Sequence, residues 1–510
     1  MSLSSVEMEW SFIVYSSTIL LPILIFIFYK RMSNYNRLPP GPPGWPLFGH
    51  IFNLGTMPHR TIAGLKQKYG PIVWLKIGSV NTMAILTADI ANEFFKNHDL
   101  SFIDRNIIDT MRSKNYHKGS LAWAPYGVYW RVMRRLCTVE MFVNKRINET
   151  VSVRRKCIDN MLLWIEKEAN SVEGRRNGIQ VARYIFLASF NIIGNLMLSQ
   201  DLVDPESKEA SDFFNAMKGL MEWGGHPNIS DLFTWLRWLD LQGLRRKMDR
   251  DMGKAIDIVS KFVKERIEER KAAGQERKDF LDVLLEFEGS KNEPAKLSEL
   301  EINIFILEIF LGGSETSSTS IEWALTELLR NPKTMIRLKN EISSIVESNR
   351  KFEESDIDKL PYLQAVIKET LRLHPPFPFL VPRKAIQDTN FMGYLIPKNT
   401  QVFVNVWAIG RDEEIWEEPL DFKPERFLGS KIDYKGQHFE FIPFGAGRRI
   451  CPGLPLGHRM THFLLGSLLH EFDWELDFST NPGTIDMNDM IGSVARKLEP
   501  LKVVPTKRVV

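Results

Sequence analysis

The residues after Ser298 carry the signals of one unusually long helix. Ser298 is followed three positions later by Glu301, which is the spacing of a capping box, and Asn331 and Pro332 provide the stop. At 1.5 Å per residue, a helix between these points measures about 45–50 Å, enough to cross a whole domain. The rest of the chain has no alternating strand–helix rhythm, so the sequence predicts a mainly α fold with minor β sheets.

Two glycines, Gly312 and Gly313, lie in the middle of this predicted helix. Each costs about 1 kcal/mol relative to alanine in a helix interior. Such a cost marks either a close approach by another group, a local bulge, or close packing against a second helix. The helix alone leaves these alternatives open.

The N-terminal segment from Trp10 to Tyr29 contains 20 residues without a charge. That length spans a hydrocarbon core of about 30 Å as a helix. A cleaved signal peptide is disfavoured, because Glu7 and Glu9 precede the segment and Lys30-Arg31 follows it. Residues 1–30 are therefore predicted to be a membrane signal-anchor. The basic residues after it, with Arg37, predict that the body faces the cytosol.

The segment after the anchor, residues 31–46, is basic and then proline-rich, with five prolines in residues 38–46. Proline at this density excludes a helix, so the segment is predicted to be a stiff hinge. Residues 47–510 then form the body. Its predicted strands include Ile72–Val80, Thr82–Thr87 and a strand–turn–strand over Gly393–Val406, and Tyr362–Leu373 is predicted to be a helix.

Overall charge and cysteine content exclude several classes of protein. With 66 Lys and Arg against 63 Asp and Glu, the net charge is +3, which gives no reason to expect nucleic acid as a partner. The three cysteines form no CxxC pair, so a disulfide framework and a cysteine-rich zinc site are both unexpected. Any cysteine chemistry must come from a single thiolate.

A glycine-rich loop, residues 441–453, delivers Cys451 to the start of an apolar helix, where backbone N–H groups favour a thiolate. A nucleophile would need a base, but His458 and His462 lie two and three turns down the helix. A thiolate beside two arginines better fits an axial ligand to a haem, whose propionates need cations. Considered without its surroundings, a lone cysteine is most often a small core residue.

The loop residues Phe444-x-x-Gly447-x-Arg449-x-Cys451-x-Gly453 resemble the haem-binding signature of the cytochromes P450. The family's ExxR and PERF elements also have counterparts, in order along the chain: Glu369-x-x-Arg372 and Pro424–Phe427. This resemblance implies the cytochrome P450 fold and haem b, with Cys451 as the axial ligand of the iron. It also implies O2 as co-substrate and electrons that NADPH supplies through NADPH-cytochrome P450 reductase. Arg134, Arg135, Arg448 and Arg449 are candidates for a basic face that docks the reductase.

The same resemblance assigns roles to residues outside the loop. Glu369, Arg372 and Arg426 would form a buried triad that braces the loop. Trp130, Arg134 and Arg383 would hold the haem propionates, with Arg105 as a further candidate.

The helix residues Gly312–Thr316 are similar to the family's oxygen-activating stretch. Thr316 would then relay protons with Glu315 as a nearby acid. The alternative for Thr316 is a helix threonine bonded to its i−4 carbonyl.

The substrate pocket, by the same resemblance, would come from residues 106–123, 304–312, 377–381 and 490–494. Its apolar members Phe377, Phe379, Leu380 and Ile309 favour a small apolar substrate. Stretches such as WLKIGSVNTMAILT and EIFLGGSET resemble plant microsomal A-type members, in particular the group of geraniol hydroxylases and iridoid oxidases.

The prediction is therefore a single-pass enzyme of the endoplasmic reticulum membrane, with its catalytic domain in the cytosol, that hydroxylates a monoterpenoid or iridoid. One alternative is a cytochrome P450 that acts on a phenolic or a larger terpenoid. Another is a haem isomerase or scaffold without oxygenase activity.

Overall fold

The computed structural model of the 510-residue chain describes residues 37–205, 212–273, 279–347, 349–477 and 481–508. The predicted anchor at residues 1–30 lies outside this part and stays a prediction. Within the described ranges, one helix, α11 (Val181–Leu198), is long and apolar enough to cross a membrane, but 78% of it is buried inside the fold. We therefore treat α11 as a core helix.

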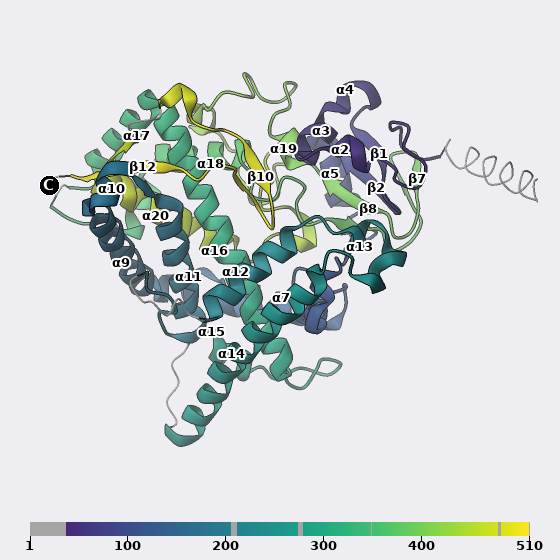
Figure 1. The fold of residues 1–510 in the computed structure, drawn as a ribbon, viewed down its shortest axis with the longest axis horizontal. Helices are drawn as coiled ribbons and strands as arrows, with labels where there is room; N and C mark the ends of the chain where they lie inside the picture. The colour runs from purple at the N-terminus through teal and green to yellow at the C-terminus, as the bar shows by residue number, and fades with distance from the viewer. Residues whose placement is uncertain (1–36, 206–211, 274–278, 348, 478–480, 509–510) are drawn as a thin grey trace, which may run out of the picture.

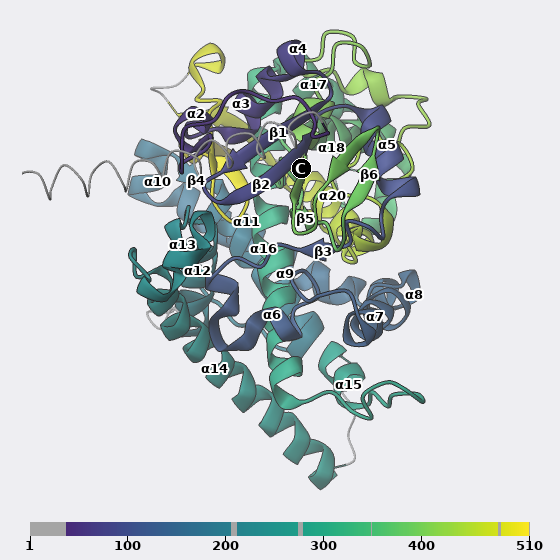
Figure 2. The ribbon, with the colours of Figure 1, turned by 90° about the vertical axis from the view of Figure 1, so that its right-hand side faces the viewer.

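The long predicted helix is α16 (Glu299–Arg330), and its bounds are confirmed. Ser298 and Glu301 form the capping box, and the helix ends directly before Asn331 and Pro332. Figure 1 and Figure 2 show α16 running through the middle of the molecule. Several helices pack against it: α11, α12 (Asp212–Gly225), α14 (Leu244–Ala273), α18 (Pro361–Leu373) and α20 (Leu454–Glu471).

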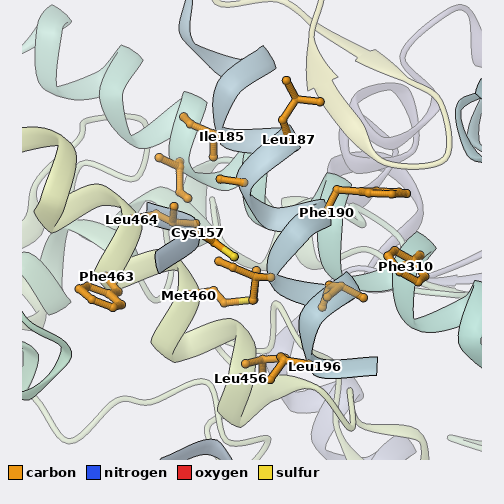
Figure 3. Packing of buried hydrophobic residues seen from close by; sticks show 14 of the residues in the cluster. Cys157, Ile185, Leu187, Phe190, Leu196, Phe310, Leu456, Met460, Phe463 and Leu464 are labelled. Atoms are coloured by element: carbon orange, nitrogen blue, oxygen red, sulfur yellow. The ribbon is translucent and has the colours of Figure 1, made fainter. Parts of the chain in front are cut away.

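The largest hydrophobic core lies where α9 (Val151–Asn170), α11, α16 and α20 meet (Figure 3). Phe190 of α11 and Phe310 of α16 have ring centroids 4.7 Å apart, and Met460 and Phe463 of α20 are buried in the same cluster. Cys157 of α9 is also part of it. This cysteine is thus a core residue, whereas Cys451 lies elsewhere.

The five-stranded sheet has the order β1-β2-β8-β5-β3. The predicted hairpin is present as β1 (Ile72–Ile77) and β2 (Val80–Ile85), paired antiparallel. Its turn comes earlier than predicted because Gly78 has a φ of 61°, the left-handed conformation that favours glycine. The space is also closed, since a Cβ there would lie 2.4 Å from the Leu232 carbonyl oxygen.

The predicted strand–turn–strand near residue 400 is present as β7 (Tyr394–Ile396) and β8 (Gln401–Val404), but the two strands do not pair with each other. β8 runs parallel to β2 and antiparallel to β5 (Arg383–Lys384), and β5 in turn pairs with β3 (Asp104–Arg105). β7 pairs with β6 (Thr389–Phe391).

Two further sheets lie away from the five-stranded one: β4-β12-β9 and β10-β11. Their strands are β4 (Ile179–Gln180), β9 (Phe472–Leu476), β10 (Asp489–Ile491), β11 (Ala495–Lys497) and β12 (Lys502–Lys507). The remaining helices are α2 (Ile51–Leu54), α3 (Pro58–Gly64), α4 (Lys66–Tyr69), α5 (Ala88–Asn97), α6 (Tyr116–Gly119), α7 (Val128–Arg135), α8 (Asn144–Glu149), α10 (Val172–Asn177), α13 (Ile229–Leu232), α15 (Phe280–Leu285), α17 (Pro332–Ile345) and α19 (Val406–Ile409).

Candidate active site

A cavity lies between the middle of α16, the loop before α7, the segment after α18 and the glycine-rich loop before α20. Including its opening to solvent, the empty space is about 1360 Å³. Its lining includes these predicted site residues: Arg105, Trp130, Arg134, Thr316, Phe377, Phe379, Leu380, Arg383, Phe444, Arg449 and Cys451.

The conformation of the loop before α20 depends on glycine. Gly445 and Gly447 have φ angles of 75° and 68°. A Cβ at Gly447 would lie 2.5 Å from a carboxylate oxygen of Asp99, so no other residue fits there without a shift. The Cys451 N–H donates to the Phe444 carbonyl at 3.0 Å, which closes the loop and presents the cysteine at the cavity wall.

The Cys451 sulfur lies at the N-terminal end of α20. Burial raises the pKa of its thiol, while hydrogen bonds from the Gly453 and Leu454 N–H groups and the charge of Arg134 act in the opposite direction. A coordinated metal ion removes the proton of such a thiol outright. His458 is instead hydrogen-bonded to Tyr434, so among the described contacts no base activates Cys451 as a nucleophile.

Three arginines converge on the cavity. Arg449 donates to the carbonyls of Ile103, Leu121 and Ala124 at 3.1, 3.2 and 2.7 Å. Burial, together with repulsion from Arg383, lowers the pKa of Arg449 to about 10. Burial also lowers the pKa of Arg383 to about 10.

The third arginine, Arg105, has its pKa lowered well below the ordinary value by burial and by the charges of Arg383 and Arg449. Among the described residues, the Arg383 Nη1 atom is buried without a hydrogen bond of good geometry, although it lies 3.2 Å from Asp99 Oδ1. Buried cations with incomplete pairing fit a ligand that carries carboxylates.

These donors match what haem b requires. A lone sulfur with two backbone N–H groups suits a thiolate ligand of iron, and the arginines suit the two propionates. Trp130 and Arg134 also line the cavity, but both are engaged by the chain: the Trp130 indole donates to the Leu121 carbonyl at 3.0 Å, and Arg134 donates to the Ile450 carbonyl.

The two glycines of α16 have different surroundings. A Cβ on Gly313 would lie 2.8 Å from the side chain of Ile193, so this glycine permits close packing against α11. Gly312 faces open space at the cavity wall. One turn later, the Thr316 hydroxyl lines the cavity and donates to the Gly312 carbonyl at 2.6 Å. Thr316 thus makes the i−4 bond and also borders the site.

Three predicted site residues, Glu315, Ile309 and Gly453, do not belong to the cavity lining. The Glu315 carboxylate accepts a hydrogen bond from the Ser493 hydroxyl, and burial raises its pKa. Ile309 is partly buried against the hydrophobic core, although it shares the α16 face of Gly312 and Thr316. Residues 490–494, predicted to line the pocket, also lie outside the lining. Gly453 borders the sulfur through its N–H rather than the cavity.

The predicted ion triad of Glu369, Arg372 and Arg426 is formed, with Glu369 and Arg372 fully buried and Arg426 partly exposed. Glu369 accepts from Arg372 Nε and Nη2, both at 2.7 Å, and from Arg426 Nε at 3.0 Å. The Lys423 N–H donates to the same carboxylate at 2.8 Å. The Glu369 carboxylate thus accepts four hydrogen bonds. These bonds and the two ion pairs make the burial of its charge tolerable.

Further lining residues were not predicted. Val402 and Val404 extend from one face of β8, Phe95 from α5, and Ser317 and Ser320 from α16. The apolar residues at alternate positions, Val402 and Val404, predict a strand, but they do not predict which face of that strand borders a cavity. The pairing of β8 between β2 and β5 decides that.

Comparisons with known proteins agree with this geometry. The family model for Cytochrome P450 matches residues 39–503. Cytochrome P450 76A2 of Solanum melongena is 61% identical over 98% of this chain and 100% of its own length. Iridoid oxidase of Catharanthus roseus is 52% identical, covering 96% of each chain. Geraniol 8-hydroxylase of Catharanthus roseus is 39% identical over 96% of this chain and 99% of that protein.

Among solved structures, a zebra fish cytochrome P450 with progesterone superposes with a TM-score of 0.74 at 26% identity, covering 88% of this chain and 99% of that chain. The fold, the thiolate loop, the buried triad and the matched length point to one conclusion. The chain belongs to the cytochrome P450 family of haem-thiolate monooxygenases.

Proposed function

We propose that this protein is a membrane-anchored monooxygenase that hydroxylates a small apolar terpenoid, a monoterpenoid or an iridoid, with NADPH-derived electrons from a reductase. The observation that carries the proposal is the cavity, where Phe377, Phe379 and Leu380 face the same space as Cys451 and Thr316. No carboxylate belongs to the described lining, so nothing there favours a cationic substrate. Relatives named iridoid oxidase, geraniol 8-hydroxylase and drimenol monooxygenase support the terpenoid class.

Haem held in this cavity by the Cys451 thiolate would supply the oxidising chemistry. The Gly453 and Leu454 N–H groups hold the sulfur in place, and Arg449, Arg383 and Arg105 would bind the propionates. Thr316 supplies a proton-bearing hydroxyl among the residues of the cavity wall. It already donates to the Gly312 carbonyl, so it can rotate between that acceptor and the cavity.

Replacing Thr316 by alanine is expected to keep haem and substrate binding but to lose product, because proton delivery fails after oxygen binds. The measurement is product formed and peroxide released per NADPH consumed, with peroxide rising as product falls. Thr326→Ala is the matched control, since Thr326 makes the same i−4 bond to Glu322 on the same helix, away from the cavity. Unchanged product per NADPH in Thr316→Ala would remove this hydroxyl from the mechanism.

The substrate class is tested by supplying geraniol, nepetalactol, a flavonoid and a fatty acid separately, with reductase and NADPH. We expect turnover of geraniol or nepetalactol, since an apolar cavity retains a small hydrocarbon with one hydroxyl. An aldehyde is retained in the same way, so further oxidation of the first product is expected. Turnover of the flavonoid or fatty acid alone would end the terpenoid proposal and leave the monooxygenase family assignment intact.

An exposed apolar patch supports the membrane part of the proposal. Phe48 of the N-terminal segment lies against Phe233, with ring centroids 5.9 Å apart, and Trp235 and Trp238 nearby are 67% and 81% exposed. Such a patch marks a membrane or protein contact, and tryptophan favours the lipid interface. The large exposed apolar side chains of the two segments are Trp45, Leu47, Phe48, Phe52, Trp235, Trp238, Leu239 and Leu241.

Deleting residues 1–30 is expected to release much of the protein from microsomes while haem stays bound, because the cavity lining that the structure describes comes from residues 95–461. The exposed apolar patch should keep a residual fraction of the truncated protein on the membrane. Replacing both Trp235 and Trp238 by serine in the truncated chain should release that fraction. Flotation of the variants with lipid vesicles measures this. Protease added to intact microsomes should digest the body, and a protected body would reverse the proposed cytosolic orientation.

The predicted basic face for the reductase is smaller than expected. Arg449 is buried, and Arg134 is bonded to the Ile450 carbonyl. Arg448 and Arg135 remain half-exposed, although they pair with Asp99 and Glu293 at 3.1 and 2.9 Å. Of the four predicted arginines, Arg135 and Arg448 thus remain the candidates for contact with a reductase.

A further inference from the structure

Glu308 lies on α16 one turn before Gly312 and has no role in the proposals above. Its Oε1 atom accepts from the Ser120 hydroxyl and from the Ala122 N–H, both at 2.7 Å, and its Oε2 atom accepts from the Leu121 N–H. Within the described part of the chain, no Lys, Arg or His lies within ion-pair distance of it. All the hydrogen bonds described for this carboxylate therefore come from three consecutive residues of one loop.

The carbonyl groups of that loop face the opposite way, toward donors at the cavity. The Leu121 carbonyl accepts from the Trp130 indole at 3.0 Å and from Arg449 at 3.2 Å. The Ala122 carbonyl accepts from Arg105 at 3.0 Å, and the Ala124 carbonyl accepts from Arg449 at 2.7 Å. The short loop thus joins Glu308 on one side to the cavity's buried cations on the other.

We propose that Glu308 is a positioning residue that fixes the loop 120–124 and, through its carbonyls, the position of the Trp130 ring and the orientation of Arg449 and Arg105 toward the haem propionates. This inference rests on haem binding in the cavity and not on the identity of the substrate. A failed substrate test would therefore leave it untouched.

A carboxylate is required because three donors must be satisfied at once. A glutamine offers one acceptor oxygen, and its NH2 group would face an N–H donor of the loop. Losing a hydrogen bond to a charged group in such a place costs about a factor of ten or more in the equilibrium between closed and open loop. Glu308→Gln should therefore loosen the loop without touching Cys451.

The test uses the full-length, haem-loaded protein and two readouts that do not depend on turnover. Amide hydrogen exchange at residues 121 and 122 should become about 10-fold faster in Glu308→Gln, and haem transfer to excess apomyoglobin should accelerate by a similar factor. Amides of β1 and β2 should exchange as before. The thiolate band of the reduced carbon monoxide complex should keep its position.

Glu322→Gln is the matched control, since Glu322 is a buried glutamate of the same helix that accepts a backbone N–H, from Leu501 at 2.9 Å, but lies away from the loop. It should lower thermal stability and leave both readouts unchanged. If Glu308→Gln does not fold, Glu308→Asp keeps the charge with a shorter reach and should accelerate the same two amides to a smaller extent. Unchanged exchange at 121 and 122, or an equal effect of Glu322→Gln on haem transfer, would overturn the proposal.

Discussion

Replacing Glu369 by glutamine is expected to leave little folded, haem-loaded protein. The carboxylate is fully buried and pairs with two guanidinium groups, those of Arg372 and Arg426. Breaking a buried ion pair from one side costs about 3–5 kcal/mol, because the remaining charge stays uncompensated. Total stabilities are about 5–15 kcal/mol, so the loss is a large part of the whole. Urea unfolding and the haem content of the purified protein measure it.

The matched control for this prediction is Glu425→Gln. Glu425 lies in the same region, in the PERF segment, and pairs with Arg337 at 2.7 Å, but both side chains are about half-exposed. Solvent screening limits such a pair to no more than about 1 kcal/mol. If Glu369→Gln unfolds at the same urea concentration as Glu425→Gln, the triad does not brace the fold.

Replacing Cys451 by serine is expected to abolish product formation with any substrate. Serine nearly preserves the shape of the side chain, and the loop geometry depends on Gly445, Gly447 and the backbone, so the protein should still fold. What is lost is the sulfur ligand. Product formed in the presence of reductase and NADPH, per mole of folded protein, measures the effect.

Cys157→Ala serves as the control for this prediction. Cys157 is buried in the core of α9, α11 and α20 (Figure 3), so its replacement should cost stability and leave turnover intact. Product formation by Cys451→Ser at the wild-type level would contradict the ligand assignment. So would a complete loss of turnover in a folded Cys157→Ala protein.

The parts of the fold that the sequence predicted correctly depend on local signals. The bounds of α16 follow from the capping box and from Pro332, which act within a few residues of the chain. The conformation of the loop before Cys451 also depends on a local signal, because Gly445 and Gly447 supply its left-handed conformations. The spacing of Glu369 and Arg372 places them on one face of a helix, whereas their triad with Arg426 was expected only from the resemblance to the cytochromes P450.

The parts that could not be predicted depend on which helix and sheet faces meet. Glu315 and Ile309 lie on α16 beside residues of the cavity, yet the packing of the β10–β11 turn and of the core directs them elsewhere. Val402 and Val404 reach the cavity because β8 inserts between β2 and β5. Glu308 carries no motif, and its role appears only when the loop of residues 120–122 lies against α16.

The measurement that tests the account most directly is the difference spectrum of the reduced protein with and without carbon monoxide. We predict the band of a thiolate-ligated haem for the wild-type protein and its loss in Cys451→Ser, because serine cannot supply the sulfur ligand. Cys157→Ala should retain it. A wild-type protein that binds haem without this band, or a Cys451→Ser protein that keeps it, would contradict the assignment of Cys451 as the axial ligand.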